Sequence, residues 1–390
     1  MSETLPSPTA PVPDPAPVKA QVPASRAFEI SSLIFFALIA LSLSGLVFFD
    51  TGWRGIGLFG LGGILGVAFL SFQYGFASVW RQALVRGEVM GLAAHFLLIG
   101  LCAIVFIPAS LWGLNAVGTI APVSVSLFIG AFMFGIGMQL ANGCGSGILF
   151  SFGGGSGRMV IALPFFILGS LLGSFLLPTA LEWGSAGPIA VAGALAELPQ
   201  TAFNLALIGG SGMGFYLLGR QRGQHLPATL FMASIIIAIL CWAVFALSGH
   251  PWGVTFGFTL WGAKIAQDLG VPVESFTFWQ WSGPARSLKH SLLSDTSSLM
   301  NIGMVLGTGM LASISGRLGG QDWPSGKQLI AAALGGILMG IGARLSFGCN
   351  IGAFLGGIAS GSLHGWIWFV LAMAGSFIGI QLRPKFGLSR

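Results

Sequence analysis

The sequence reads GAFMFGIGMQLANGCGSG over Gly130–Gly147 and GGILMGIGARLSFGCNIG over Gly335–Gly352. Several glycines, one isoleucine, one leucine and the Gly-Cys pair fall at the same places in both stretches. A short apolar segment follows each cysteine, over 145–152 in one copy and 350–359 in the other. We interpret both copies as membrane helices that break at Gly-Cys and continue as re-entrant pieces, which protein or water must surround.

The composition around these stretches is that of a membrane protein. Of the 390 residues, 54% are hydrophobic and only 7% are charged, against roughly 25% charged in soluble domains. The mean hydropathy is +0.87. These values exclude a soluble enzyme domain, a disulfide scaffold and a disordered chain, and they predict an all-α polytopic membrane protein. The net charge of +6 is spread along the chain, so we expect no nucleic-acid partner.

Apolar runs of membrane-spanning length predict about ten transmembrane helices. Residues 1–27 are rich in proline and predict a disordered tail. We divide the rest into an extra N-terminal helix (28–50), a first transport repeat (51–200) and a second (201–390). The stretches 188–198 and 252–281 are less apolar and could be interfacial or re-entrant pieces. The predicted spans are 30–49, 55–76, 89–111, 122–141, 158–178, 201–219, 228–247, 297–315, 328–345 and 363–382.

The two Gly-Cys copies end the fourth and ninth predicted spans. Their positions in the series differ by an odd number, so the two helices would cross the membrane in opposite directions. Inverted repeats of this kind are typical of transporters, whose substrate site lies near the midplane, where the repeats meet. Twelve Lys and Arg residues fall on the side of the termini and four on the other side. This bias predicts that both termini are cytoplasmic.

A helix break exposes backbone N–H groups, and the positive end of a half-helix attracts anions. Arg344 is the one basic residue deep in a predicted span, and its counterpart in the other copy is Gln139. A charge there costs at least roughly 2.5–3.5 kcal/mol. The Arg344 side chain is therefore expected to bind the substrate, to pair with a backbone carbonyl or to extend to a membrane interface. The candidate substrate-binding residues besides the cysteines are Gly143, Gly145, Ser146, Gly348, Asn350, Gln139 and Arg344.

The thiols are the most specific chemical feature. A thiol is soft and polarizable, and serine would suit an ordinary anion as well. Cys144 and Cys349 at matching breaks therefore indicate a substrate that carries sulfur or selenium. Cys102 and Cys241 lie in plain apolar runs and are interpreted as packing residues. The histidines have no metal-ligand spacing and are interpreted as structural or loop residues, so we expect no metal site: His95, His250, His290 and His364.

Residues 134–158 and 340–352 resemble the two signatures of the YeeE/YedE family of bacterial inner-membrane sulfur transporters. The resemblance implies thiosulfate uptake through an hourglass-shaped protein, with the ion passed between cysteines without net redox change. It also implies a small TusA-like sulfur-carrier protein as a possible partner. Cys144 and Cys349 match two family cysteines. The family's third cysteine, near the end of an early helix, corresponds here to Gly75.

The sequence thus predicts a transporter for thiosulfate or a related small sulfur-containing anion in the bacterial inner membrane. It is not expected to be an enzyme or to need a cofactor. Three alternatives stay open: a membrane thiol-disulfide oxidoreductase that cycles a Cys144–Cys349 disulfide, a passive small-solute channel, and a structural membrane subunit.

Overall fold

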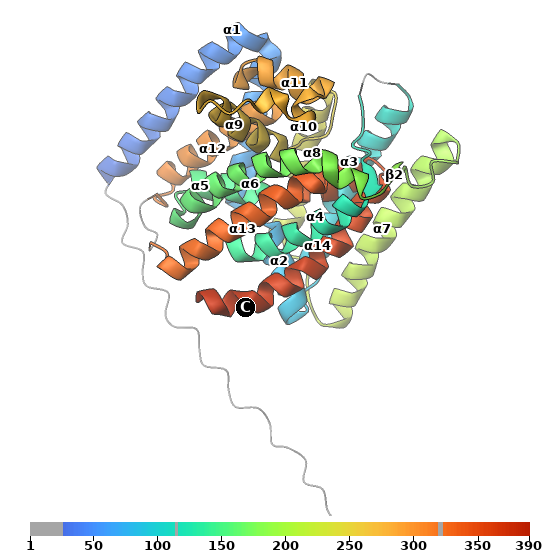
Figure 1. Cartoon of the computed structure of the whole chain (residues 1–390). Coiled ribbons are helices and arrows are strands. Elements are labelled where there is room, and N and C mark those ends of the chain that lie inside the picture. Colours follow the sequence, from blue (N-terminus) through green and yellow to red (C-terminus); the bar gives the residue numbers. More distant parts are fainter. Residues whose placement is uncertain (1–25, 114–115, 319–322) are drawn as a thin grey trace, which may run out of the picture.

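The computed structural model describes residues 26–113, 116–318 and 323–390, which are helical almost throughout (Figure 1). The tail predicted over 1–27 lies outside the described residues, apart from 26 and 27, which begin the first helix. Nine helices of the described part are long and apolar enough to cross a membrane. The prediction of an all-α polytopic membrane protein is confirmed.

The long helices are α1 (Arg26–Phe72), α3 (Met90–Leu111), α4 (Val125–Ala141), α6 (Gly157–Glu182), α7 (Glu197–Gln221), α8 (Ala228–Ser248), α12 (Thr296–Ile314), α13 (Gly326–Leu345) and α14 (Leu363–Leu382). The shorter helices are α2 (Phe76–Arg86), α5 (Gly145–Gly153), α9 (Thr255–Asp268), α10 (Thr277–Gln280) and α11 (Ser282–Lys289). Single turns of 3₁₀-helix form η1 (Val273–Ser275), η2 (Leu292–Ser294) and η4 (Arg383–Phe386), whereas η3 (Asn350–Gly357) is a π-helix. Two short strands, β1 (Pro122–Ser124) and β2 (Ser185–Pro188), pair antiparallel.

Helix α1 contains both of the first two predicted spans. Its backbone leaves the helical region at Gly52 (φ 65°, ψ −157°), which divides the element into two helices. This merging is why nine long elements correspond to ten predicted spans. Most side chains of the first half are at least partly exposed, and this half lies along the edge of the molecule (Figure 1). Exposed apolar side chains here are suited to contact with lipid.

The centre of the fold is the antiparallel pair of α4 and α13. A Cβ atom on Gly130 would lie 2.7 Å from the carbonyl oxygen of Gly342, and one on Gly137 would lie 2.6 Å from that of Gly335. An early glycine of each helix thus meets a late glycine of the other. Small residues allow two membrane helices to approach this closely.

Each central helix also packs on the second long helix of the other repeat. A Cβ atom on Gly169 of α6 would lie 2.5 Å from the carbonyl oxygen of Ile337 in α13. The matching glycine of the second repeat, Gly375 of α14, faces the carbonyl of Phe132 in α4 in the same way. The two pairings are equivalent, so the repeats are related by an inverted pseudo-twofold arrangement.

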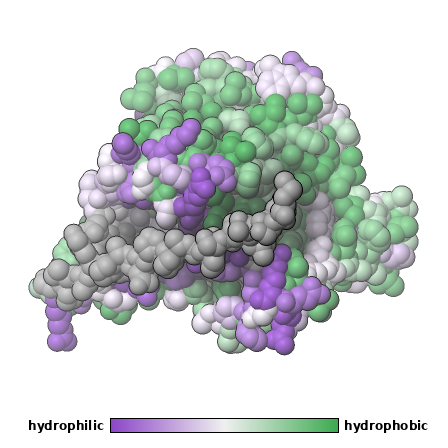
Figure 2. Space-filling view, turned by 90° about the horizontal axis from the view of Figure 1, so that it is seen from below, coloured by the Kyte–Doolittle hydropathy of each residue, from purple (hydrophilic) through white to green (hydrophobic). Residues whose placement is uncertain are grey.

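The remaining helices surround this centre. Helix α3 packs on α7 and α8, and α1 packs on α12. The stretch 252–281 contains the short helix α9, which packs on α6 and α12. At 1.5 Å per residue its 14 residues reach only about 21 Å, too short to span a bilayer. On the face seen in Figure 2, hydrophilic residues form separate patches on an otherwise largely hydrophobic surface.

Candidate functional site at the two helix breaks

The first break lies between α4 and α5. Asn142 ends α4 in the left-handed conformation (φ 63°), and Cys144 then takes the position that precedes the first residue of α5. The backbone N–H of Gly147 donates a hydrogen bond to Cys144 Sγ at 3.3 Å. The hydroxyl of Ser146 lies 3.5 Å from the same sulfur. Cys144 thus holds the start of the half-helix in the way that a serine or aspartate usually does.

The second break, between α13 and η3, has a similar backbone path, although η3 begins without a capping hydrogen bond to the Cys349 side chain. Phe347 occupies the repeat position of Asn142 and has the same left-handed backbone (φ 61°). A bulky side chain is strained in that conformation, and such strain is concentrated at functional sites. Gly348 (φ 157°) and Cys349 follow, and Cys349 precedes the π-helix η3. π-Helical turns also occur often at functional sites.

The structure brings the two breaks into contact. A Cβ atom on Gly145 would lie 3.1 Å from Cys349 Sγ and 3.4 Å from Cys349 Cβ. Gly145 directly follows Cys144, so Cys349 packs against the start of the half-helix that Cys144 caps. Both are buried (1% and 0% exposed), and both are free thiols. Two thiols 205 positions apart in the chain therefore share one buried region.

Asn350 is the polar residue that most suggests a ligand. Its side chain is fully buried, and both its amide nitrogen and its amide oxygen have no hydrogen-bond partner among the described residues. Burying a polar group without a hydrogen bond is costly. Asn350 takes the repeat position of Gly145, next to Cys349. A small polar substrate beside the thiol would satisfy this amide.

Arg344 and Gln139 hold matching positions but have different surroundings. The Arg344 guanidinium lies between the rings of Phe256 and Phe278, 5.9 and 5.7 Å from their centroids. Its Nε atom has no hydrogen-bond partner among the described residues. The aromatic faces thus stabilise this half-buried cation. Gln139 instead turns toward α2 and donates a hydrogen bond from Nε2 to the carbonyl oxygen of Ala77 (3.2 Å).

A cavity of about 190 Å³ adjoins Cys144. Gly75, the position that corresponds to the third family cysteine, lines this same cavity. It lies at a third interruption of the helices, where α1 ends and α2 begins, with Gln73 in the left-handed region (φ 50°). Position 75 and Cys144 therefore border the same cavity, and a Cβ atom on Gly75 would lie 2.9 Å from Ser78 Oγ.

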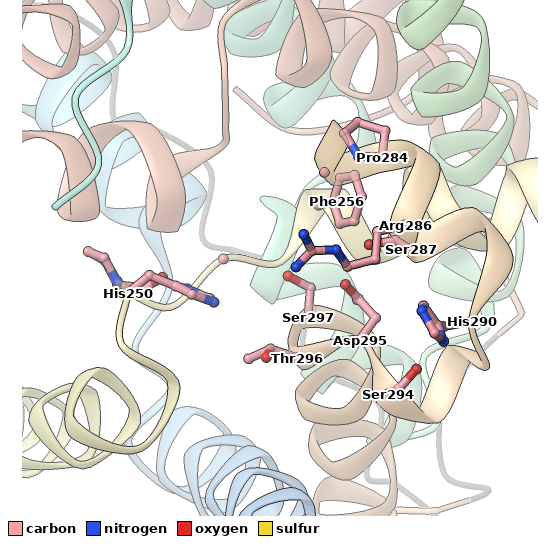
Figure 3. Close-up of a pocket in the computed structure, with 13 residues that line it drawn as sticks. His250, Phe256, Pro284, Arg286, Ser287, His290, Ser294, Asp295, Thr296 and Ser297 are labelled. Atoms are coloured by element: carbon pink, nitrogen blue, oxygen red, sulfur yellow. The ribbon is translucent and has the colours of Figure 1, made fainter. Parts of the chain in front are cut away.

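A larger cavity, of about 830 Å³, lies at the N-terminal end of α12 (Figure 3). Its lining includes His250, Arg286, His290 and Asp295. Figure 3 shows His250 on one side and the other three across the pocket. Burial raises the pKa of the Asp295 carboxyl, although a hydrogen bond from the backbone N–H of Ser298 opposes this rise.

Sequence reasoning missed this cavity, because its lining comes from several separate segments and its histidines were assigned to loops. Phe256 lines it as well, and the ring of the same residue lies 5.9 Å from the Arg344 guanidinium carbon. Two further histidines are buried: His95 stacks on Phe76 with ring centroids 4.3 Å apart, and His364 lies 2.6 Å from the Ser362 hydroxyl. Among the described residues, no group of three His, Cys, Asp or Glu side chains is placed to hold a metal ion.

Comparison with known proteins identifies the family. Its sequence profile, described as sulphur transport, matches residues 73–378, which include Gly75 and both breaks. The chain belongs to the sulphur transport family. The chain is 33% identical over 165 residues to the probable transporter YedE of Escherichia coli, covering 41% of this chain and 40% of YedE. It is 27% identical over 288 residues to the thiosulfate transporter TsuA of Spirochaeta thermophila, covering 68% of this chain and 77% of TsuA.

A second YedE, from Salmonella typhimurium, is 33% identical over 149 residues, which is 36% of its length. The matches to the two YedE proteins thus span about two fifths of those relatives. The family is described as sulphur transport and these relatives are named as transporters, which agrees with the expectation that the chain is not an enzyme.

Proposed function

We propose that this protein carries thiosulfate, or a related small sulfur-containing anion, into the cell across the bacterial inner membrane. Membership in the sulphur transport family and similarity to a thiosulfate transporter support the substrate class. The observation that carries the proposal is the pair of free thiols, Cys144 and Cys349, which are buried together at opposed helix breaks.

In the proposed mechanism, the terminal sulfur of the anion accepts a weak hydrogen bond from one thiol and then from the other. No covalent bond forms or breaks, so the step needs no oxidant or reductant. The Asn350 amide, which has no partner among the described residues, donates to an oxygen of the anion. Moving an ion into a dry, low-dielectric interior has an idealised penalty of order 20 kcal/mol. Backbone N–H groups at the breaks and retained water must offset most of it.

The route would run between the two cavities. Asp295 lines the 830 Å³ cavity at one end of α12, and Arg317 lies just beyond the other end. The excess of Lys and Arg on the side of the termini favours cytoplasmic N- and C-termini. On this orientation the large cavity receives the anion from outside, and the cavity beside Cys144 releases it to the cytoplasm. A small TusA-like sulfur carrier would act on the cytoplasmic side.

The repeats would supply one half-helix each. We assign 51–200 to the first transport repeat and 201–390 to the second, with 28–50 as an additional helix. The family match begins at residue 73, and the exposed first half of α1 packs at the edge of the fold. Both facts support a helix outside the transport unit.

Uptake of labelled thiosulfate into proteoliposomes tests the proposal. Cys144→Ala and Cys349→Ala should each abolish uptake, because each removes one sulfur contact of the path. Cys102→Ala is the matched control: it removes a buried thiol of α3 and should leave uptake unchanged. Full uptake by the double variant of the two site cysteines would exclude the thiol relay.

Further measurements on the same protein distinguish the alternative functions. A stable intramolecular Cys144–Cys349 disulfide, detected by mass under oxidising conditions, would favour the oxidoreductase. Flux that does not saturate with thiosulfate would favour a passive channel. No flux at all would favour a structural subunit.

A further inference from the structure

Three arginines from three different elements meet around Asn142, on the side of the thiol pair away from the large cavity. These are Arg81 of α2, Arg158 at the start of α6 and Arg383 of η4, which we call the arginine cluster. Arg81 Nη1 and Arg383 Nη1 donate to Asn142 Oδ1 at 2.9 and 3.2 Å. Arg158 and Asn142 line one cavity of about 290 Å³. The break that places Cys144 thus also gathers three guanidinium groups.

The charge of the cluster is not balanced by acidic side chains of the described residues. Among these residues, the ion pair at 3.8 Å joins Arg86 to Glu88, outside the cluster. The three guanidinium groups are close enough to repel one another. The Arg158 side chain makes no hydrogen bond or ion pair with the described residues, and Arg383 is only 3% exposed. Like charges gathered at a partly buried place favour the binding of an anion.

The cluster lies directly on the way from Cys144 to the surface. Asn142 lines three neighbouring cavities: the one of about 190 Å³ that contains Cys144, the one of about 290 Å³ and one of about 380 Å³ that reaches Arg317. Arg81 lines the first of them. None of the described residues that line the three cavities is acidic. An anion that leaves Cys144 would pass the guanidinium groups next.

We propose that the arginine cluster is a second anion site, which binds the oxygen end of a small divalent oxyanion beside the thiol pair. The inference rests on the proposed function and adds a second binding site to the same transport path. Guanidinium groups present planar, paired N–H donors that match the oxygens of sulfate-like ions. Recognition here needs charge and oxygens but no terminal sulfur. Sulfate should therefore bind to the cluster even though it cannot use the thiols in the proposed way.

Sulfate titration of the purified full-length protein in detergent, followed by calorimetry, tests the site. The double variant Cys144→Ala/Cys349→Ala should bind sulfate as the wild type does. Arg158→Gln should weaken sulfate binding at least tenfold; it disrupts no hydrogen bond of the described residues, so the fold should persist. Arg220→Gln is the matched control, with the same charge change on α7, and should have no effect. Unchanged sulfate affinity in Arg158→Gln would overturn the proposal.

A lipid headgroup could supply the same phosphate-like chemistry, so the titration is repeated in nanodiscs. Sulfate binding that is equal in neutral phosphatidylcholine and in anionic phosphatidylglycerol supports a site for the soluble anion. Binding that disappears only in phosphatidylglycerol assigns the cluster to lipid and overturns the proposal. The two proposals can fail independently. Thiosulfate uptake that does not depend on Cys144 would exclude the thiol relay, whereas sulfate binding that depends on Arg158 would still establish the anion site.

Discussion

The substitution Gly145→Ala tests how closely the two helix breaks must approach for transport. The new methyl group would lie 3.1 Å from Cys349 Sγ, and ordinary van der Waals contact begins at 3.4 Å. Because the interior is close-packed, the sulfur or the half-helix must move by at least about 0.3 Å. The methyl group also occupies space beside Cys349, where the terminal sulfur of the anion would sit.

The stability change should be small. Overpacking in a core costs about 1–3 kcal/mol, whereas alanine is favoured over glycine in a helix by up to roughly 1 kcal/mol. Gly145 is the first residue of α5, so part of this gain applies. We expect a net loss of about 0–2 kcal/mol of unfolding free energy. The effect on transport should be larger, because loss of about 1.4 kcal/mol of substrate binding already corresponds to a factor of ten.

Initial rates of thiosulfate uptake into proteoliposomes provide the assay, with the unfolding temperature measured on the same preparations. Gly145→Ala should reduce uptake at least tenfold while the protein stays folded. Gly60→Ala is the control: it makes the same change in α1, where a Cβ atom would meet nothing within 4 Å. Uptake at the wild-type rate by Gly145→Ala would refute the close approach of the breaks, and so would an equal loss in Gly60→Ala.

Three further substitutions test other parts of the structure. Gly137→Ala places a methyl group 2.6 Å from the carbonyl oxygen of Gly335, so unfolding free energy should fall by at least about 1–3 kcal/mol; an unchanged unfolding temperature would contradict the packing of α4 on α13. Burial raises the pKa of Asp295, so the unfolding free energy of the wild type should fall as pH rises through that raised pKa. Asp295→Asn should lack this fall. Identical dependence of stability on pH in both proteins between pH 4 and 8 would exclude the contribution of Asp295. Gly75→Cys places a thiol at the cavity of Cys144, and the backbone there (φ −111°) accepts any residue. A small reagent should alkylate this thiol, thiosulfate should protect it, and mass spectrometry measures both effects. A thiol that does not react would place position 75 away from the transport path.

The positions of both helix breaks follow from the sequence because their causes are local. An apolar run that stops at Gly-Cys and resumes predicts a half-helix, and α5 and η3 begin at the residues expected, Gly145 and Asn350. Matched glycines also indicate where antiparallel helices touch, since only small residues permit that approach. The assignment of Cys144 and Cys349 to the substrate stays a prediction, although the fold brings the two thiols together.

Other features required the tertiary structure, because they join residues that no local pattern relates. Arg344 lies between Phe256 and Phe278, which belong to a stretch that hydropathy leaves ambiguous. The arginine cluster combines residues that, taken along the chain, indicate only which loops face the cytoplasm. Hydropathy determines which segments enter the bilayer, because transfer from water depends on each segment's own composition. Which side chains then meet is decided by helix packing, which depends on the shape of all neighbouring helices together.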